Sequence, residues 1–328
     1  MGAQNNAQVL ARAEERLRSI GLTGGQAFEA LLMGLRCHLG DDVDADPVAI
    51  RALEGLRVDP DGDLIGLAYE RFFADLFKGR KGQYFTPRPI VDLALALSNV
   101  QPGETVMDPT CGSGGFLVGA ARRGAMVRGL EIDPYLAQLA SLNLRLAGFA
   151  SDIRHADFFS SEPVPVDVVL ANPPFSIEIS DLDILDRYDL GRGRSRVLSD
   201  WLFIEALERW VVPGGRAVVV VPWSVVVNPS AAPLRERMDA HWHREAICGL
   251  PEGVFRPFGG AAGRAFMLWL RRDARGQQGT SKWANLIDPG YDVRSRQVRK
   301  TTDAEVNRLI RGSGWSALPA GSWTPAAS

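Results

Sequence analysis

The tetrapeptide Asn172-Pro173-Pro174-Phe175 carries the clearest chemical signal in this sequence. The segment before it, residues 166–171, is short, apolar and rich in β-branched residues, which predicts a buried central strand. Two consecutive prolines end such a strand and stiffen the loop that follows it. The side-chain oxygen of Asn172 and the carbonyl of Pro173 can then accept hydrogen bonds from one NH2 group, while Phe175 can stack on a planar base. The pattern indicates chemistry at an amino group, although Pro-rich segments also mark ordinary turns.

A glycine-rich turn is predicted upstream of this loop. Residues 104–108 are typical of a strand, and residues 109–115, Pro-Thr-Cys-Gly-Ser-Gly-Gly, connect it to an apolar helix that begins near Phe116. The spacing of the glycines is not that of the dinucleotide fingerprint, and Asp108 at the strand end would repel a pyrophosphate. No Gly-Lys-Ser or Gly-Lys-Thr follows, so a P-loop is also excluded. We therefore expect the backbone to approach a different kind of ligand closely.

Two acidic positions follow the next predicted strands. Glu131 ends the strand predicted at 125–130, and a carboxylate at this distance beyond a glycine-rich turn suits the hydroxyl groups of a ribose. Asp157-Phe158 follows a strand predicted near 152–155, where the carboxylate can accept from an adenine amine and the aromatic ring can cover the base. Each acid taken alone is equally well explained as a solvated residue at a strand end.

Together these segments resemble the class I S-adenosylmethionine-dependent methyltransferases, and among them the DNA adenine methyltransferases that modify an amino group. Residues 81–88, Lys-Gly-Gln-Tyr-Phe-Thr-Pro-Arg, resemble the aromatic-x-Thr-Pro segment of that group. Its position before the glycine turn, with Asn-Pro-Pro-Phe after both, matches the γ arrangement. Residues 247–255 also resemble this group. The resemblance extends from Leu64 to Arg311 and points to the modification subunit of type I restriction systems.

The resemblance implies the fold and the reaction. The expected fold is α/β, a Rossmann-like and mostly parallel seven-stranded sheet with helices on both faces, plus a small N-terminal helical region. The implied reaction transfers a methyl group from the cofactor S-adenosyl-L-methionine to the N6 amine of an adenine flipped out of DNA. Modification subunits take their sequence recognition from a separate specificity subunit, so such a partner is expected, since no segment here has the length of a target-recognition domain.

The same resemblance assigns roles to individual residues. Those implied to hold the target base are Asn172, Pro173, Pro174 and Phe175. Those implied to bind the cofactor are Tyr84, Phe85, Thr86, Asp108, Pro109, Thr110, Gly112, Ser113, Gly114, Glu131, Ile132, Asp157, Phe158 and Asn172.

Four regions are expected along the chain. They are an N-terminal helical region at 1–78, a catalytic domain at 79–272, a C-terminal extension at 273–311 and a disordered tail at 312–328. The tail prediction rests on its content of Gly, Ser, Pro and Ala. Within the extension, residues 282–287 predict a strand, and Thr302-Asp303-Ala304-Glu305 has the capping-box pattern of a short helix.

The charge is unevenly distributed, although the formal net charge is only −2. Residues 1–77 contain thirteen Asp and Glu against seven Arg, whereas residues 251–300 contain ten Arg and Lys against four Asp and Glu. The DNA-facing surface is therefore expected towards the C-terminus. The candidate phosphate-binding residues are Arg192, Arg194, Arg196 and Arg256. The first three can equally well pair with the acidic residues of the preceding loop, 176–190.

No apolar run approaches the roughly 20 residues that a membrane span requires, and the N-terminus does not resemble a signal peptide, which predicts a cytoplasmic protein. Cys37, Cys111 and Cys248 have no metal-ligand spacing and the four histidines form no cluster, so no metal is expected. Two rival functions remain open: methylation of a protein glutamine, whose enzymes use Asn-Pro-Pro-Tyr, and a non-catalytic, cofactor-binding subunit of a defence assembly.

Overall fold

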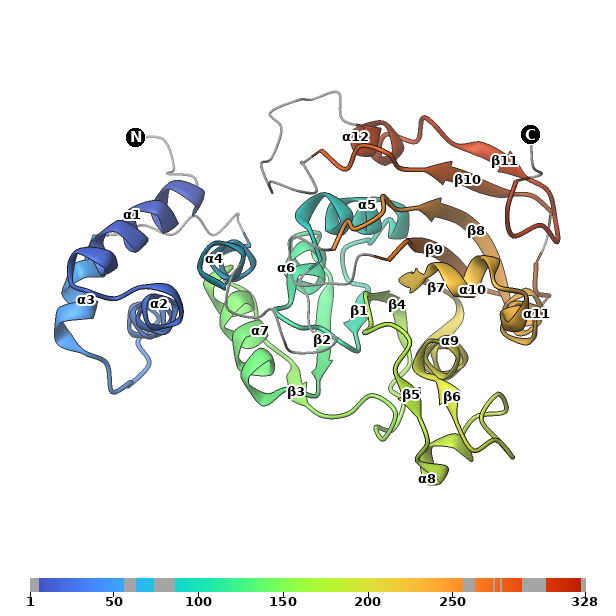
Figure 1. Cartoon of the computed structure of the whole chain (residues 1–328), viewed down its shortest axis with the longest axis horizontal. Helices are drawn as coiled ribbons and strands as arrows, with labels where there is room; N and C mark the ends of the chain where they lie inside the picture. The colour runs from blue at the N-terminus through green and yellow to red at the C-terminus, as the bar shows by residue number, and fades with distance from the viewer. Residues whose placement is uncertain are drawn as a thin grey trace.

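The structure is a computed structural model of the 328-residue chain, and it describes residues 6–55, 63–73, 86–255, 263–273, 275–277, 279–290 and 305–325. Its described residues form one nine-stranded sheet with the order β11-β10-β8-β9-β7-β4-β1-β2-β3 (Figure 1). These strands are β1 Thr105–Asp108, β2 Met126–Glu131, β3 Ile153–His155, β4 Val166–Ala171, β7 Val211–Pro222, β8 Trp242–Gly249, β9 Ala265–Arg272, β10 Ser281–Asn285 and β11 Ser316–Leu318. The separate pair β5 Glu178–Ile179 and β6 Val197–Leu198 forms a small antiparallel ribbon.

The strand order places a topological switch point between β1 and β4. The chain moves outward from β1 through β2 to β3 and then returns to β4 on the other side of β1, and all these neighbours are parallel. Strand β7 continues the parallel part, whereas β9 is antiparallel to both β7 and β8. Parallel sheets bind ligands where the strand order reverses, so the loops after β1 and β4 are the expected binding loops.

The predicted mostly parallel α/β sheet is confirmed, but the predicted number of seven strands is wrong. Seven strands, from β8 to β3, correspond to the expected sheet, and two further strands extend it at the β8 edge. Strand β10 pairs in parallel with β8, and β11 pairs with β10 in the antiparallel direction. The exposed edge of β8 offers unpaired backbone groups, and β10 satisfies them. The segment beyond residue 272 therefore continues the catalytic sheet.

Helices cover both faces of the sheet, as expected for buried parallel strands. The helices are α1 Asn6–Ser19, α2 Gly24–His38, α3 Pro47–Leu53, α4 Leu64–Phe73, α5 Arg88–Ser98, α6 Gly115–Ala121, α7 Pro134–Leu146, α8 Leu182–Leu185, α9 Ser199–Trp210, α10 Trp223–Val227, α11 Ala232–His241 and α12 Glu305–Ile310, with a 3-10 turn at Pro229–Ala231. Strand β7 shows the two faces directly, because Val218 and Val220 join the core with α5, α6 and α7, while Val219 and Val221 join the core with α9 and α11. None of the described helices combines the length and the hydrophobicity needed to cross a bilayer.

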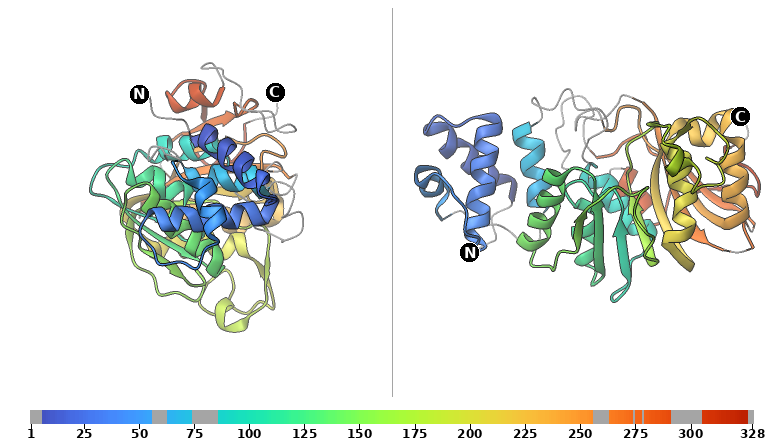
Figure 2. Two further views of the ribbon diagram at one scale, coloured as in Figure 1. Left: turned by 90° about the vertical axis from the view of Figure 1, so that its left-hand side faces the viewer. Right: turned by 90° about the horizontal axis from the view of Figure 1, so that it is seen from below.

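The N-terminal helices form a third core against α7. Helices α1 to α4 contribute apolar side chains such as Leu17, Phe28 and Ile65, and the outer side of α7 contributes Leu136 and Leu139. Figure 2 shows α1 to α3 at one end of the molecule, next to α4 and α7. The predicted N-terminal helical region is therefore present and joined to the catalytic sheet through α7. Helix α4 is described as far as Phe73, so the rest of the helix predicted up to residue 77 lies outside the described residues.

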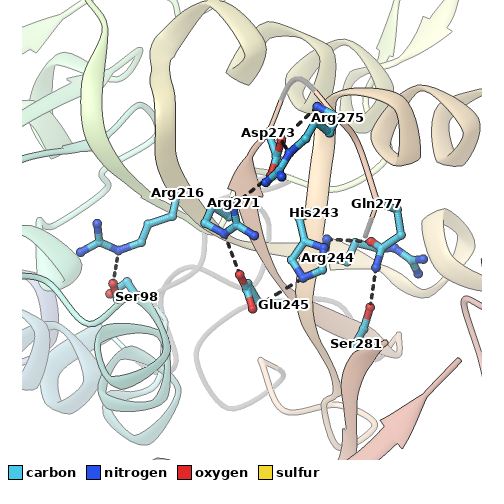
Figure 3. A network of polar contacts seen from close by, with 10 residues as sticks. All are labelled: Ser98, Arg216, His243, Arg244, Glu245, Arg271, Asp273, Arg275, Gln277 and Ser281. Atoms are coloured by element: carbon cyan, nitrogen blue, oxygen red, sulfur yellow. Dashed lines mark hydrogen bonds and ion pairs between the residues drawn. The ribbon is translucent and has the colours of Figure 1, made fainter. Parts of the chain in front are cut away.

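A polar network joins the C-terminal strands to one another (Figure 3). The guanidinium of Arg271 on β9 donates to Glu245 on β8 at 2.8 Å and to Asp273 at 3.1 Å. Gln277 accepts from the backbone N–H of Arg244 at 2.8 Å and donates to the hydroxyl of Ser281 at 3.3 Å, which connects β8 to the start of β10. These contacts fix the position of β10 at the sheet edge.

The prediction of a disordered tail is wrong for residues 312–325. Besides β11, the tail contributes Trp323, whose ring lies 4.1 Å from the guanidinium carbon of the fully buried Arg244 and whose indole N–H donates to Asp239 at 3.1 Å. Arg244 also donates to the carbonyl of Ser322 at 2.8 Å and pairs with Asp239 at 3.1 Å. A Gly- and Pro-rich composition does not prevent order when a buried charge requires these partners. The capping box predicted from Thr302 lies outside the described residues except for Glu305.

Candidate active site

The glycine-rich turn follows β1 as predicted and leads directly into α6. Gly112 and Gly114 both have positive φ angles, 52° and 81°, which side chains other than glycine rarely adopt. A Cβ at Gly112 would meet no atom within 4 Å, so its backbone is open to an approaching ligand. A Cβ at Gly114 would lie 3.3 Å from that of Ala140 on α7, so this glycine also permits close helix packing. The backbone N–H of Cys111 donates to the carbonyl of Leu130 at 2.9 Å, which fixes the turn against β2.

Two buried carboxylates flank the turn. Glu131 at the end of β2 accepts from the backbone N–H of Gly112 and of Asp133, each at 2.9 Å. Asp108 at the end of β1 accepts from the backbone N–H of Thr110 at 3.1 Å and is only 2% exposed. Burial raises the pKa of Asp108 to about 8, and the negative charge of Glu131 adds to this rise. Burial likewise raises the pKa of Glu131. The site thus holds two acids whose burial disfavours their ionised forms, and a cationic ligand would favour those ionised forms.

The Asn-Pro-Pro-Phe loop leaves the buried strand β4 beside this turn. The amide nitrogen of Asn172 donates to the hydroxyl of Thr86 at 3.0 Å, which fixes the orientation of the amide and identifies its oxygen as the acceptor atom. Phe175 packs edge-on against Phe255, with ring centroids 6.1 Å apart and planes at 76°. Thr86 lies two residues before α5, so the described end of the aromatic-x-Thr-Pro segment contacts the loop after β4.

The predicted pair Asp157-Phe158 lies after β3. The carboxylate of Asp157 accepts from the backbone N–H of Phe159 at 3.1 Å and from the hydroxyl of Ser160 at 2.8 Å, so it closes the turn. The ring of Phe158 is mostly buried and packs against Phe203 of α9, with centroids 4.9 Å apart. Phe158 is therefore largely a core residue that presents one side to the site.

These residues surround one cavity of about 550 Å³, a size typical of small-molecule sites. The predicted residues that line it are Thr86, Asp108, Pro109, Thr110, Gly112, Ser113, Glu131, Ile132, Asp157, Phe158, Asn172, Pro173 and Pro174. Among the described residues, the predicted site residues that do not line it are Gly114, Phe175, Arg192, Arg194 and Arg196. Tyr84, Phe85 and Arg256 lie outside the described residues.

Sequence analysis missed two acidic residues that line the cavity, Asp63 and Asp200. Asp63 precedes α4 and accepts from the side-chain amide of Asn143 at 2.7 Å and from the backbone N–H of Gly66 at 2.9 Å. Asn143 on α7 also donates to the carbonyl of Ser113 in the glycine turn at 2.9 Å. The only sequence signal for Asp63 was its position directly before a helix, which marks a cap and gives no indication of a ligand.

The arginines after the Asn-Pro-Pro-Phe loop lie around the ribbon of β5 and β6. Arg192 pairs with Asp189 at 3.3 Å, and Arg196 pairs with Glu178 at 3.4 Å. Arg194 lies over the ring of Trp201, 5.8 Å from its centroid. The pairing with acidic residues is thus present, but the side chains of Arg192 and Arg196 are about two-thirds exposed, and such surface pairs are weak. A role in DNA binding stays a prediction for these three residues.

The strand order, the glycine turn after β1 and the acid after β2 together define a class I methyltransferase fold. The chain belongs to the N-6 DNA methylase family, whose model matches residues 60–311.

Comparison with individual proteins agrees with this family. The chain is 27% identical over 220 residues to the methylase subunit of the type I restriction enzyme EcoEI of Escherichia coli, which covers 60% of this chain and 44% of that protein. It is 29% identical over 209 residues to the EcoKI methylase subunit of Escherichia coli K12, covering 54% of this chain and 38% of that protein. The fold is similar to that of a type I restriction-modification methyltransferase subunit from Streptococcus thermophilus, with a TM-score of 0.66, 18% identity, and coverage of 97% and 76%. The chain spans less than half the length of these two curated relatives.

Proposed function

We propose that this chain is the catalytic part of a site-specific DNA methyltransferase that methylates the N6 amine of a flipped-out adenine. One observation carries the proposal: the oriented amide of Asn172 and the glycine turn after β1 line the same cavity. An amino-group acceptor and a backbone-lined ligand site are thus adjacent, which a methyl transfer between two bound molecules requires.

The residues present fit S-adenosylmethionine as the cofactor. The open backbone at Gly112 suits its amino-acid end, and the buried carboxylate of Glu131 suits the two hydroxyl groups of its ribose. Ile132 follows directly, lines the cavity and is 64% exposed, so it offers an apolar surface to one face of an adenine ring. Asp157 and Phe158 lie across the same cavity as further contacts for that ring.

The chemistry needs no strong base from the protein. When bound, S-adenosylmethionine supplies a methyl group on a positively charged sulfur. Asn172 and the carbonyl of Pro173 accept hydrogen bonds from the target amine and direct the lone pair of its nitrogen away from the ring. These acceptors would stabilise the positive charge that develops on the nitrogen while its bond to the methyl carbon forms and the bond from that carbon to sulfur breaks; the nitrogen then releases its extra proton to solvent. Phe175, held edge-on by Phe255, provides an aromatic surface for the flipped base.

Recognition of the DNA sequence is assigned to a separate specificity subunit. Two type I methylase subunits are among the similar proteins, which supports a place in a restriction-modification or related defence system. Arg192, Arg194 and Arg196 are the described candidates for phosphate contacts, and Arg256 is a further candidate from the sequence.

The proposal is tested by sequencing DNA from cells that express the chain with and without its neighbouring genes, using a readout that resolves N6-methyladenine. We expect methylation at a defined motif when the specificity gene is present. Asn172→Ala should lower the methylation rate by about 10²- to 10³-fold, the usual scale for losing one oriented contact of this kind, because it removes an acceptor from the target amine.

The matched control is the affinity of the Asn172→Ala protein for S-adenosylhomocysteine, measured by calorimetry, which should fall far less than the methylation rate. Methylation by the chain alone would show that no specificity subunit is needed. If no adenine were methylated either with or without the neighbouring genes, the proposal of a DNA substrate would be wrong. A methylated protein glutamine in the same cells would then identify the rival substrate.

A further inference from the structure

Asp200 is a buried acid that the reaction outlined above does not use. It lies in the first turn of α9, is 3% exposed, and lines the cavity beside the Asn-Pro-Pro-Phe loop. Its oxygen Oδ2 accepts from the backbone N–H of Ser176 at 3.0 Å and from the Ser176 hydroxyl at 3.2 Å. One half of the carboxylate is therefore committed to the loop.

This contact holds an unusual backbone conformation. Ser176 follows Phe175 directly and has a φ angle of 55°, in the left-handed region that residues other than glycine seldom occupy. Strained residues persist where their surroundings determine them, and such positions concentrate at functional sites. Asp200 thus fixes the direction in which the chain leaves the target-base loop.

The other half of the carboxylate has no such role. Oδ1 of Asp200 is buried and meets no hydrogen-bond partner from another described residue. Leaving a buried polar atom without a partner is costly, and native structures rarely do so unless a ligand or water completes the site. Because Asp200 lines the cavity, a ligand in the cavity is the natural donor for this oxygen.

The wall around Asp200 indicates what kind of ligand this is. The neighbouring lining residues from the loop after β4, from α8 and from α9 are mainly apolar: Ile177, Ile179, Ile184 and Phe203. An apolar wall with one buried acceptor suits a flat heterocycle that carries one N–H donor. A sugar or an amino-acid group would require several polar partners in the same place.

Resting on the proposed function, we propose that Oδ1 of Asp200 accepts a hydrogen bond from the exocyclic amino group of an adenine ring bound in the cavity. Both ligands of the proposed reaction contain this group, but the two N–H bonds of the target amine are already directed at Asn172 and the Pro173 carbonyl, so the amine of the cofactor is the expected donor. Asp200 is then a ligand-contacting residue and, through Ser176, also a positioning residue for the Asn-Pro-Pro-Phe loop.

The protonation of Asp200 is compatible with this role. Burial raises its pKa to about 6, and the hydrogen bonds from Ser176 oppose the rise. The side chain is therefore ionised at pH 7.5, where it accepts hydrogen bonds and cannot donate one.

The test is the isosteric change Asp200→Asn combined with removal of the amino group from the ligand. In the variant the amide oxygen can still accept from Ser176, so the NH2 group takes the place of Oδ1 and repels an amine. Calorimetry compares S-adenosylhomocysteine with its analogue that has hydrogen in place of the 6-amino group. A second arm compares DNA with adenine or unsubstituted purine at the methylated position. Ser176→Ala and the exposed Asp42→Asn serve as matched controls.

We expect the unaltered protein to prefer the amino-bearing ligand in the first arm by about 10- to 100-fold, the usual range for a hydrogen bond to a charged group. In Asp200→Asn the affinity ratio of the two ligands should be at least about ten-fold smaller than in the unaltered protein, whereas both controls should keep the ratio of the unaltered protein. Loss in the first arm identifies the cofactor as the donor, whereas loss in the second arm alone would show that the target amine contacts Asp200 and would overturn this assignment. Preferences that Asp200→Asn leaves unchanged in both arms would overturn the contact alone. A protein that bound neither S-adenosylhomocysteine nor DNA would overturn the proposed function and the contact with it.

Discussion

Replacing Asp108 with asparagine tests whether the buried acids of this site are arranged for a cationic ligand. Asp108 lines the cavity at the end of β1, and its pKa is raised to about 8, mainly by burial. The hydrogen bond from Thr110 opposes this rise, and the negative charge of Glu131 adds to it. In the free protein Asp108 is therefore mostly protonated at pH 6 and becomes mostly ionised only above pH 8.

The amino-acid end of the cofactor carries a positive ammonium group, which favours the ionised form of Asp108. Below pH 8 binding must then release the proton, so the affinity should rise by about ten-fold for each pH unit. Because the group is half ionised at pH 8, the change between pH 6 and pH 8 amounts to about 50-fold, or about 2.3 kcal/mol of binding free energy. Asp108→Asn has no proton to release, so its affinity should be low and nearly independent of pH over the same range.

The ionisation of Asp108 affects folding stability in the opposite direction to ligand affinity: stability falls as the pH rises. A carboxyl group whose pKa is raised in the folded protein favours the fold while it is protonated, so its contribution is lost as the pH rises from about 4 to about 8. Relative to the unaltered protein, Asp108→Asn should thus gain stability in the absence of ligand at pH 8 and gain none at pH 4.

The assay is calorimetric titration with S-adenosylhomocysteine at pH 6, 7, 8 and 9, each in two buffers of different ionisation enthalpy so that proton release is counted directly. The exposed Asp42→Asn provides the same chemical change away from the site and should follow the unaltered protein. Equal affinity at pH 6 and pH 8 in the unaltered protein, with no proton released, would refute the reasoning.

Three further substitutions test other contacts. Glu131→Ala should weaken the binding of S-adenosylhomocysteine by about 1 to 3 kcal/mol, because hydrogen bonds to its ribose are lost. The same calorimetry measures this change, and an unchanged affinity would mean that Glu131 does not hold the ribose. Asn143→Leu should lower the free energy of unfolding by about 2 to 4 kcal/mol in urea titrations, since it removes one of the donors to Asp63 and the side-chain donor to the carbonyl of Ser113. Trp323→Ala should also lower the free energy of unfolding by about 2 to 4 kcal/mol, because it uncovers the buried guanidinium of Arg244. An unchanged free energy of unfolding would mean that the tail does not contribute to stability.

The parts of the fold that could be predicted are those with a local cause. Buried parallel strands need continuous β-branched runs, so residues 166–171 identify β4 without knowledge of their neighbours. The positive φ angles at Gly112 and Gly114 are possible because glycine lacks a Cβ, so the turn after β1 is also visible in the sequence. The prolines after Asn172 fix the loop in the same way.

The missed features depend on partners that are far away along the chain. The tail is ordered because Trp323 and Ser322 contact Arg244, which lies nearly 80 residues earlier, and no property of the tail itself indicates this. Asp200 is a polar residue in the first turn of an amphipathic helix, where acids are common, and only the packing of α9 against the loop after β4 buries it. Sequence patterns report local periodicity and carry no information on such long-range burial.

The N-terminal region is part of the site because Asn143 holds both sides of it. The amide nitrogen of Asn143 donates to Asp63, just before α4, and to the carbonyl of Ser113 in the glycine turn. Asp63 itself lines the cavity, and a Cβ on Gly115 would lie only 3.2 Å from its carboxylate, so the helix start and the turn are in close contact. A displacement of α4 must therefore also move the carboxylate of Asp63 and the carbonyl of Ser113. Because helices α1 to α3 and α4 share one core, we expect a protein bound to these helices to change the affinity for S-adenosylhomocysteine, and calorimetry with and without that protein would measure the change.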